Sequence, residues 1–146
     1  MFMRRLAVFC LCAALSWNAL AQAAEKPRVD FVYFGASDCP YCRAWENWDL
    51  PKLQASETFQ RVRFTKVTKN IRSPVPGEFW FPKEIKHLRD PIAEQLKGAG
   101  SPMFAILADG KVVLAWKGTR RGTEELIRIF EQQLARPAAG AAQPDS

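Results

Sequence analysis

The sequence predicts a single α/β domain, and three stretches carry that prediction. An apolar segment, Val29–Gly35, leads into Cys39-Pro40-Tyr41-Cys42, where a helical segment begins. Two further apolar runs flank Asp109-Gly110, a dipeptide that favours a two-residue hairpin turn. Apolar residues at helical spacing then run from Leu126 to Leu134. Strand and helix patterns therefore share one chain, as in a sheet covered by helices.

The first 23 residues are expected to be a signal peptide. Arg4 and Arg5 precede an apolar run, and Ala21-Gln22-Ala23 fits an A-x-A cleavage site, with a rival at Ala19-Leu20-Ala21. Cleavage after Ala23 would leave 123 of 146 residues, enough for one core, and would lower the formal charge from +6 to +4. Because the apolar run is short for a membrane span, we expect export to the periplasm and no stable membrane insertion after cleavage.

The cysteine count directs attention to one pair. Cys10 and Cys12 belong to the predicted signal peptide, so the mature chain keeps Cys39 and Cys42. Thiols at this spacing suit redox chemistry, because the second can release a mixed disulfide formed at the first by intramolecular attack. Zinc sites share the spacing but need four ligands. A structural bridge and a metal-holding dithiol stay open at this point.

The position of Cys39 predicts how the two thiols differ. Pro40 suits the first turn of a helix, so Cys39 is expected at the helix N-terminus. There the free backbone N–H groups and the helix dipole favour a thiolate, whereas the carboxylate of Asp38 opposes one. We therefore expect Cys39 to be the more exposed and more acidic thiol, with Cys42 one turn further in.

The stretch after the first helix predicts a second strand. Leu50-Pro51 interrupts the helical pattern, and a short helical segment is expected from Lys52 to Gln60. The segment Arg61–Val67 then alternates as a strand does, with Val62 and Phe64 on one face.

Residues 61–77 contain basic side chains and no acid: Arg61, Arg63, Lys66, Lys69 and Arg72. Two interpretations are open, a docking surface for acidic partners and a solvated strand face with its loop. Nucleic acid is not an expected partner, because the chain is predicted to be exported and lacks interleaved basic and stacking residues.

The stretch 73–90 is the least regular part of the chain. Its aromatic cluster, Phe79-Trp80-Phe81, either lines a client groove or covers a sheet edge. Asp90 followed by Pro91 has the pattern of a helix cap and first turn, and the helix is expected to end at Gly98.

The C-terminal half predicts a hairpin and a closing helix. Met103–Leu107 and Lys111–Trp116 are the two expected strands, and Thr123 is the expected cap of the last helix. The predicted boundaries are 1–23 for the signal peptide, 24–136 for the domain and 137–146 for a disordered tail.

From about Arg28 to Ala135 this order of parts resembles the thioredoxin superfamily. The resemblance is carried by Cys39-Pro40-Tyr41-Cys42, Ser101-Pro102 and Asp109-Gly110. It implies a thioredoxin-like fold, a central mixed sheet flanked by helices. It also implies that Cys39 is the nucleophile and Cys42 the resolving cysteine. Ser101, Pro102 and Tyr41 would contact the client, with the Ser101-Pro102 bond cis.

Three features depart from the usual thioredoxin pattern. The Cys-Pro-Tyr-Cys motif is typical of glutaredoxins, Tyr33 stands where thioredoxins have a buried acid, and 72–90 resembles an insertion. The resemblance implies a thiol-disulfide oxidoreductase that exchanges disulfides with protein clients and needs no bound cofactor. A membrane or soluble redox partner would reset its dithiol. The alternatives are a glutathione-linked reductase and a dithiol module for metal-site assembly.

Overall fold

The computed structural model describes residues 26–137. The elements, in chain order, are β1 Val29–Gly35, α1 Pro40–Trp48, α2 Leu50–Gln54, α3 Glu57–Gln60, β2 Arg63–Thr68, the 3-10 helices η1 Glu78–Trp80 and η2 Lys83–Leu88, α4 Arg89–Gln95, β3 Met103–Ala108, β4 Lys111–Lys117 and α5 Thr123–Leu134. The predicted signal peptide and positions 138–146 of the predicted tail lie outside the described residues.

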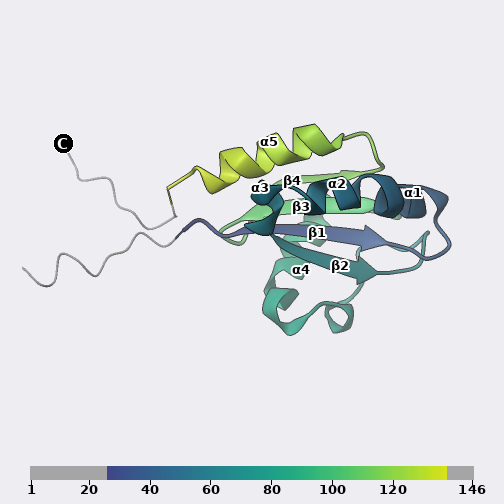
Figure 1. Cartoon of the computed structure of the whole chain (residues 1–146). Helices are drawn as coiled ribbons and strands as arrows, with labels where there is room; N and C mark the ends of the chain where they lie inside the picture. Colours follow the sequence, from purple (N-terminus) through teal and green to yellow (C-terminus); the bar gives the residue numbers. More distant parts are fainter. Residues whose placement is uncertain (1–25, 138–146) are drawn as a thin grey trace, which may run out of the picture.

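The strands form one mixed sheet in the order β2–β1–β3–β4 (Figure 1). β1 runs parallel to β2 and antiparallel to β3, and β3 pairs with β4 in an antiparallel hairpin. Its turn is the predicted Asp109-Gly110, where φ is positive at both residues, 50° and 76°. The central mixed sheet and the hairpin predicted from the sequence are both confirmed.

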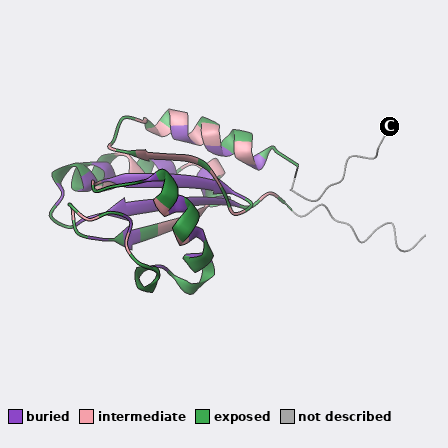
Figure 2. Cartoon of the chain, turned by 180° about the vertical axis from the view of Figure 1, so that it is seen from behind, coloured by how far each residue is buried: buried purple, intermediate pink, exposed green. Residues whose placement is uncertain are grey.

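The two central strands, β1 and β3, are buried along their whole length (Figure 2). Because side chains alternate along a strand, β1 supplies both faces of the sheet. Phe31 and Tyr33 pack in a core with residues of α1, α2, α3 and α5, whereas Val32 and Phe34 pack in a second core with residues of η2 and α4. Helices therefore cover both faces.

One end of the sheet gathers four loops. Gly35 pairs with Thr68, Phe34 with Met103, and Met103 with Lys117, so these strand ends lie together. The loops 36–39, 69–77, 97–102 and 118–122 consequently meet at that end, where α1 begins (Figure 1). We call it the dithiol end.

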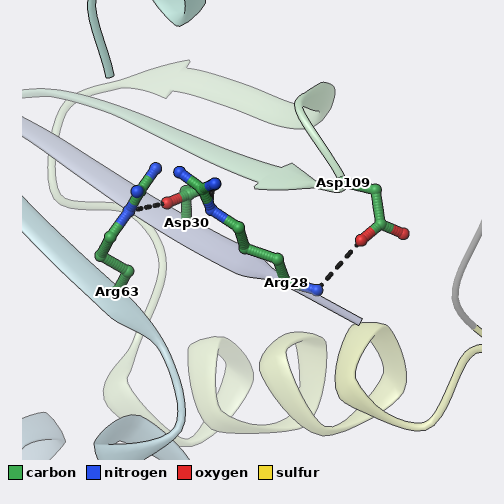
Figure 3. Close-up of polar contacts among 4 residues, drawn as sticks. All are labelled: Arg28, Asp30, Arg63 and Asp109. Carbon is green, nitrogen blue, oxygen red and sulfur yellow. Dashed lines mark hydrogen bonds and ion pairs between the residues drawn. The ribbon is translucent and has the colours of Figure 1, made fainter. Parts of the chain in front are cut away.

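The opposite end of the sheet is held by a buried carboxylate. Asp30 is paired with the Arg63 side chain of β2, and Arg28 lies 3.4 Å away (Figure 3). The backbone N–H of Arg28 also donates to the Asp109 carboxylate at 3.0 Å, and the Asp109 N–H donates to the Arg28 carbonyl at 2.8 Å. These contacts join the start of β1 to β2 and to the hairpin turn.

Several predicted element boundaries were wrong. The single helical segment Lys52–Gln60 is two short helices, α2 and α3, with Ser56 capping α3. β2 begins at Arg63 rather than Arg61, because Val62 still belongs to the turn that follows α3 and its N–H donates to Phe59.

Two predicted helix caps were also wrong. η2 runs directly into α4, so α4 begins at Arg89 and Asp90 lies inside its first turn instead of capping it; the helix ends at Gln95. Gly122, not Thr123, precedes α5, and the Thr123 hydroxyl instead donates to Asp49 at 3.4 Å.

Candidate active site

The two cysteines form a disulfide at the start of α1. Their Cα atoms lie 5.2 Å apart, and Pro40 occupies the first helical turn. Cys39 is the N-cap residue, and its Sγ atom accepts a hydrogen bond from the Cys42 backbone N–H at 3.1 Å. A sulfur in this position receives a helix-terminal N–H that has no partner inside the helix. The predicted placement of Cys39 at a helix N-terminus is confirmed.

The expected difference in exposure between the thiols was wrong for the disulfide form. Cys39 and Cys42 are both 0% exposed. Both belong to the core cluster that also contains Tyr33 and Trp45, so closing the ring places both sulfurs against that core. Tyr41, between them, is 69% exposed and lies on the surface.

The Ser101-Pro102 turn lies at the dithiol end, directly before β3. The bond between the two residues is cis, as expected. Pro102 is buried, and its carbonyl accepts from the Gly118 N–H at 2.9 Å. The Ser101 main-chain N–H and C=O make no hydrogen bond to residues 26–137, and neither does its buried hydroxyl.

Two lysines hold the loop before this turn. Lys69 Nζ donates to the carbonyls of Asn70, Ser73 and Gly100, and Lys117 Nζ donates to those of Lys97 and Ala99. Burial lowers the pKa of Lys69, and the nearby charge of Lys117 lowers it further. The loop is therefore fixed from the end of β2 and from the end of β4.

A polar network lies beside the dithiol core. Tyr33 is fully buried, and its hydroxyl donates to the Glu46 carboxylate at 2.9 Å. Burial, with this hydrogen bond and the charge of Glu46, raises the pKa of the Tyr33 phenol far above its usual value. Glu46 also pairs with Lys66 at 2.8 Å. Tyr33 thus keeps its proton and serves as a donor, and Glu46 supplies the carboxylate.

This carboxylate is open to a small cavity. The cavity has a volume of about 180 Å³ and is lined by Gly35, Ala36, Ser37, Arg43, Glu46, Lys66 and Thr68. Since Glu46 lies one helical turn after Cys42, the two side chains share a face of α1. The cavity therefore connects the surface beside the dithiol loop with the polar network.

Comparison with known proteins gives structural likenesses only. No protein-family model and no curated protein matches the chain. The periplasmic thioredoxin SoxS from Paracoccus pantotrophus is similar at 12% identity, over 73% of this chain and 98% of that one, with a TM-score of 0.45. Trxlp from Edwardsiella tarda is similar at 21% identity, over 81% and 91% of the two chains, with a TM-score of 0.45. Thioredoxin f2 from Chlamydomonas reinhardtii is similar at 23% identity, over 80% and 86%, with a TM-score of 0.45.

The fold class follows from the chain's own geometry. A dithiol motif opens the helix after the central strand, and a cis proline precedes the antiparallel hairpin of the same mixed sheet. The fold is thioredoxin-like. The predicted fold class is therefore confirmed.

The segment 72–90, predicted to be an insertion and called the insertion below, forms the wall of a groove. The groove has a volume of about 440 Å³ and is lined by Ser37, Thr68, Lys69, Asn70, Ser73, Pro74, Val75, Pro76, Gly77 and Trp80. Within the predicted aromatic cluster, Phe81 is buried in the core, whereas Phe79 and Trp80 are 87% and 62% exposed. The cluster is therefore divided between the core and the surface beside the groove.

Glu46 was not predicted to be the partner of Tyr33, although Tyr33 was expected to stand where thioredoxins have a buried acid. A signal existed, since Glu46 follows Cys42 by four residues and must lie on the same helical face. The roles of Lys69 and Lys117 left no comparable signal, because they depend on how distant loops meet.

Residues 26–137 contain no group of three or more His, Cys, Asp or Glu side chains placed to hold a metal ion. None of the helices in this range combines the length and the apolar character that crossing a bilayer requires.

Proposed function

We propose that the protein is a thiol-disulfide oxidoreductase that exchanges disulfides with protein clients through Cys39 and Cys42. The observation that carries the proposal is the hydrogen bond from the Cys42 N–H to Cys39 Sγ at the N-terminus of α1. The same N–H would stabilise a negative charge on Cys39 in the reduced form and so favour its reactive thiolate.

The exchange follows from this placement. The Cys39 thiolate attacks a client disulfide, forms a mixed disulfide and releases one client thiolate. Cys42, deprotonated, then attacks Cys39 Sγ, closes the Cys39–Cys42 disulfide and releases the second client thiol. Two electrons pass from the dithiol to the client, and the reverse sequence oxidises a client dithiol.

Client contacts are assigned to Tyr41, Ser101 and Pro102. In support, the main-chain N–H and C=O of Ser101 have no partner within residues 26–137, so they are free to pair with an extended client strand. Tyr41 supplies an exposed aromatic ring between the two cysteines. Pro102 is buried and its carbonyl accepts from the Gly118 N–H, so its part in the proposed contact is to hold the turn in place rather than to present its ring.

The proposed site of action is the periplasm, with a membrane or soluble redox partner resetting the dithiol. The support for export is the signal-peptide pattern of residues 1–23. N-terminal sequencing of the secreted protein should find Gln22 or Ala24 first, and Met1 on the mature chain would contradict export with cleavage.

Separate serine variants of the two cysteines test the proposal. Cys39→Ser should abolish exchange with a protein disulfide such as that of insulin. Cys42→Ser should instead trap mixed disulfides with clients, which non-reducing gel electrophoresis would reveal as reductant-sensitive adducts. Adducts on Cys39→Ser, or full turnover by Cys42→Ser, would contradict the assigned roles.

A further inference from the structure

The dithiol end carries an excess of free positive charge. Four exposed basic side chains, which we call the cationic rim, surround it: Arg43, Arg72, Lys97 and Arg120. None of the four forms a salt bridge with another residue of the described range. The exposed carboxylates at this end, Asp38, Glu78 and, in the first turn of α5, Glu124, offset only part of this charge.

Other basic residues at this end are already engaged. Lys66 pairs with Glu46, and Arg121 with Glu125. The ammonium groups of Lys69 and Lys117 donate to main-chain carbonyls, so their positive charges are not cancelled by acids. The unpaired basic side chains of this end therefore lie on α1 and on the loops that meet where α1 begins.

The dithiol end also has a groove and a main-chain segment without hydrogen-bond partners in the described range. The groove beside Ser37 has a volume of about 440 Å³, and Trp80 on its wall is 62% exposed. Across the same end of the sheet, the N–H and C=O of Ser101 are free to pair with a strand. No acidic side chain lines the groove, and its one charged residue is Lys69.

We propose that the clients present their cysteine within an acidic, extended segment that docks between the insertion and the Ser101 turn. This inference rests on the proposed exchange function and names its substrate class. Positive charge around a reactive centre raises the association rate of acidic partners, by between about 10- and 1,000-fold in known cases at low salt. The effect is screened once charges are more than about 8 Å apart at physiological ionic strength.

Paired peptides test the proposal on the reduced, full-length mature protein. Each peptide carries one cysteine as a mixed disulfide with pyridine-2-thiol, flanked by glutamates in one peptide and by glutamines in the other. Attack by Cys39 on the peptide sulfur releases pyridine-2-thione, whose absorbance gives the rate. The acidic peptide should react about tenfold faster at low salt, and the difference should shrink as salt rises.

Charge reversals with equal net charge locate the effect. Arg72→Glu combined with Arg120→Glu changes the rim. The control, Arg61→Glu combined with Lys111→Glu, changes exposed residues at the other end of the sheet, one just before β2 and one at the start of β4. The rim variant should lose most of the preference for the acidic peptide, and the control variant should keep it. Reaction with neutral bis(2-hydroxyethyl) disulfide should be similar in all three proteins, which shows that each keeps a reactive dithiol, and matching circular dichroism spectra show that each is folded.

The outcomes separate the two proposals. If the parent reacts with the neutral disulfide but shows no preference for the acidic peptide, or if both double variants lose the preference equally, the docking inference is overturned and the exchange function stands. If the reduced parent reacts with none of the disulfides, the exchange function itself is wrong. Should the rim variant fail to fold, the salt dependence of the parent alone decides, because a preference unaffected by salt contradicts charge attraction.

Discussion

Removing the acceptor of the Tyr33–Glu46 hydrogen bond should lower the free energy of unfolding more than removing its donor. Glu46→Leu keeps a helix-forming side chain of similar size. It leaves the hydroxyl of the fully buried Tyr33 without a hydrogen-bond acceptor. Leaving a buried donor without a partner costs about 1–3 kcal/mol, and loss of the half-exposed Lys66 pair adds up to about 1 kcal/mol. We expect Glu46→Leu to lower the free energy of unfolding by about 2–3 kcal/mol.

Tyr33→Phe should be much milder. The ring keeps its packing against Trp45 and Phe104, with centroids 4.5 and 5.2 Å away. Glu46 keeps Lys66 and its access to the small cavity, so its carboxylate remains solvated. The expected cost is below about 1 kcal/mol, and adding Tyr33→Phe to Glu46→Leu should restore about 1–2 kcal/mol.

Urea unfolding of the disulfide form, followed by circular dichroism, measures these differences. The double-mutant cycle isolates the coupling between the two residues. If Tyr33→Phe costs as much as Glu46→Leu, or if the two costs simply add, the hydroxyl does not depend on Glu46 and the reasoning fails.

Further predictions concern pH, packing and charge. The pKa of Tyr33 is raised above 10.0, so the stability due to its proton is fully present below pH 10 and falls by about 1.4 kcal/mol per pH unit above it. Unfolding experiments at alkaline pH should find a shallower decline in Tyr33→Phe, and identical slopes would contradict the raised pKa. Gly35→Ala should destabilise the protein by about 1–3 kcal/mol, because the new methyl would lie 2.5 Å from the Tyr33 hydroxyl oxygen, whereas Gly77→Ala has open space and serves as the neutral control in thermal unfolding. Arg63→Met should cost about 3 kcal/mol, because the buried Asp30 carboxylate would keep only the longer contact with half-exposed Arg28; recovery in a double variant with Asp30→Leu would confirm the cause, and a cost near zero would refute it.

The strands could be predicted from the sequence because their signals are local. The apolar run of β3 and the Asp-Gly turn need no distant partner to be recognised, and both lie where they were expected. Pro40 likewise marked the start of α1, and with it the helix-terminal position of Cys39.

The errors arose where distant segments compete for the same groups. Thr123 is a residue type that often caps helices, but its hydroxyl donates to Asp49 at the end of α1. Gly122 occupies the N-cap position of α5 instead. The buried state of Cys39 depends on the core that surrounds the closed ring, which no local pattern encodes. Two of the basic residues between 61 and 77 form ion pairs with acids far away in the sequence: Arg63 with Asp30, and Lys66 with Glu46.

The insertion is anchored in a way that bears on protein engineering. Val75 and Phe81 are buried in the core, Lys69 holds Ser73, and Arg89 donates to the Pro76 carbonyl at 3.1 Å. Between these anchors, residues 77–80 are all exposed. A short segment of foreign sequence grafted at 77–80 would therefore be held at both ends by these anchors. It would replace exposed residues and no side chain of the core. This makes 77–80 a natural position for libraries that retarget the domain while its dithiol chemistry is left untouched.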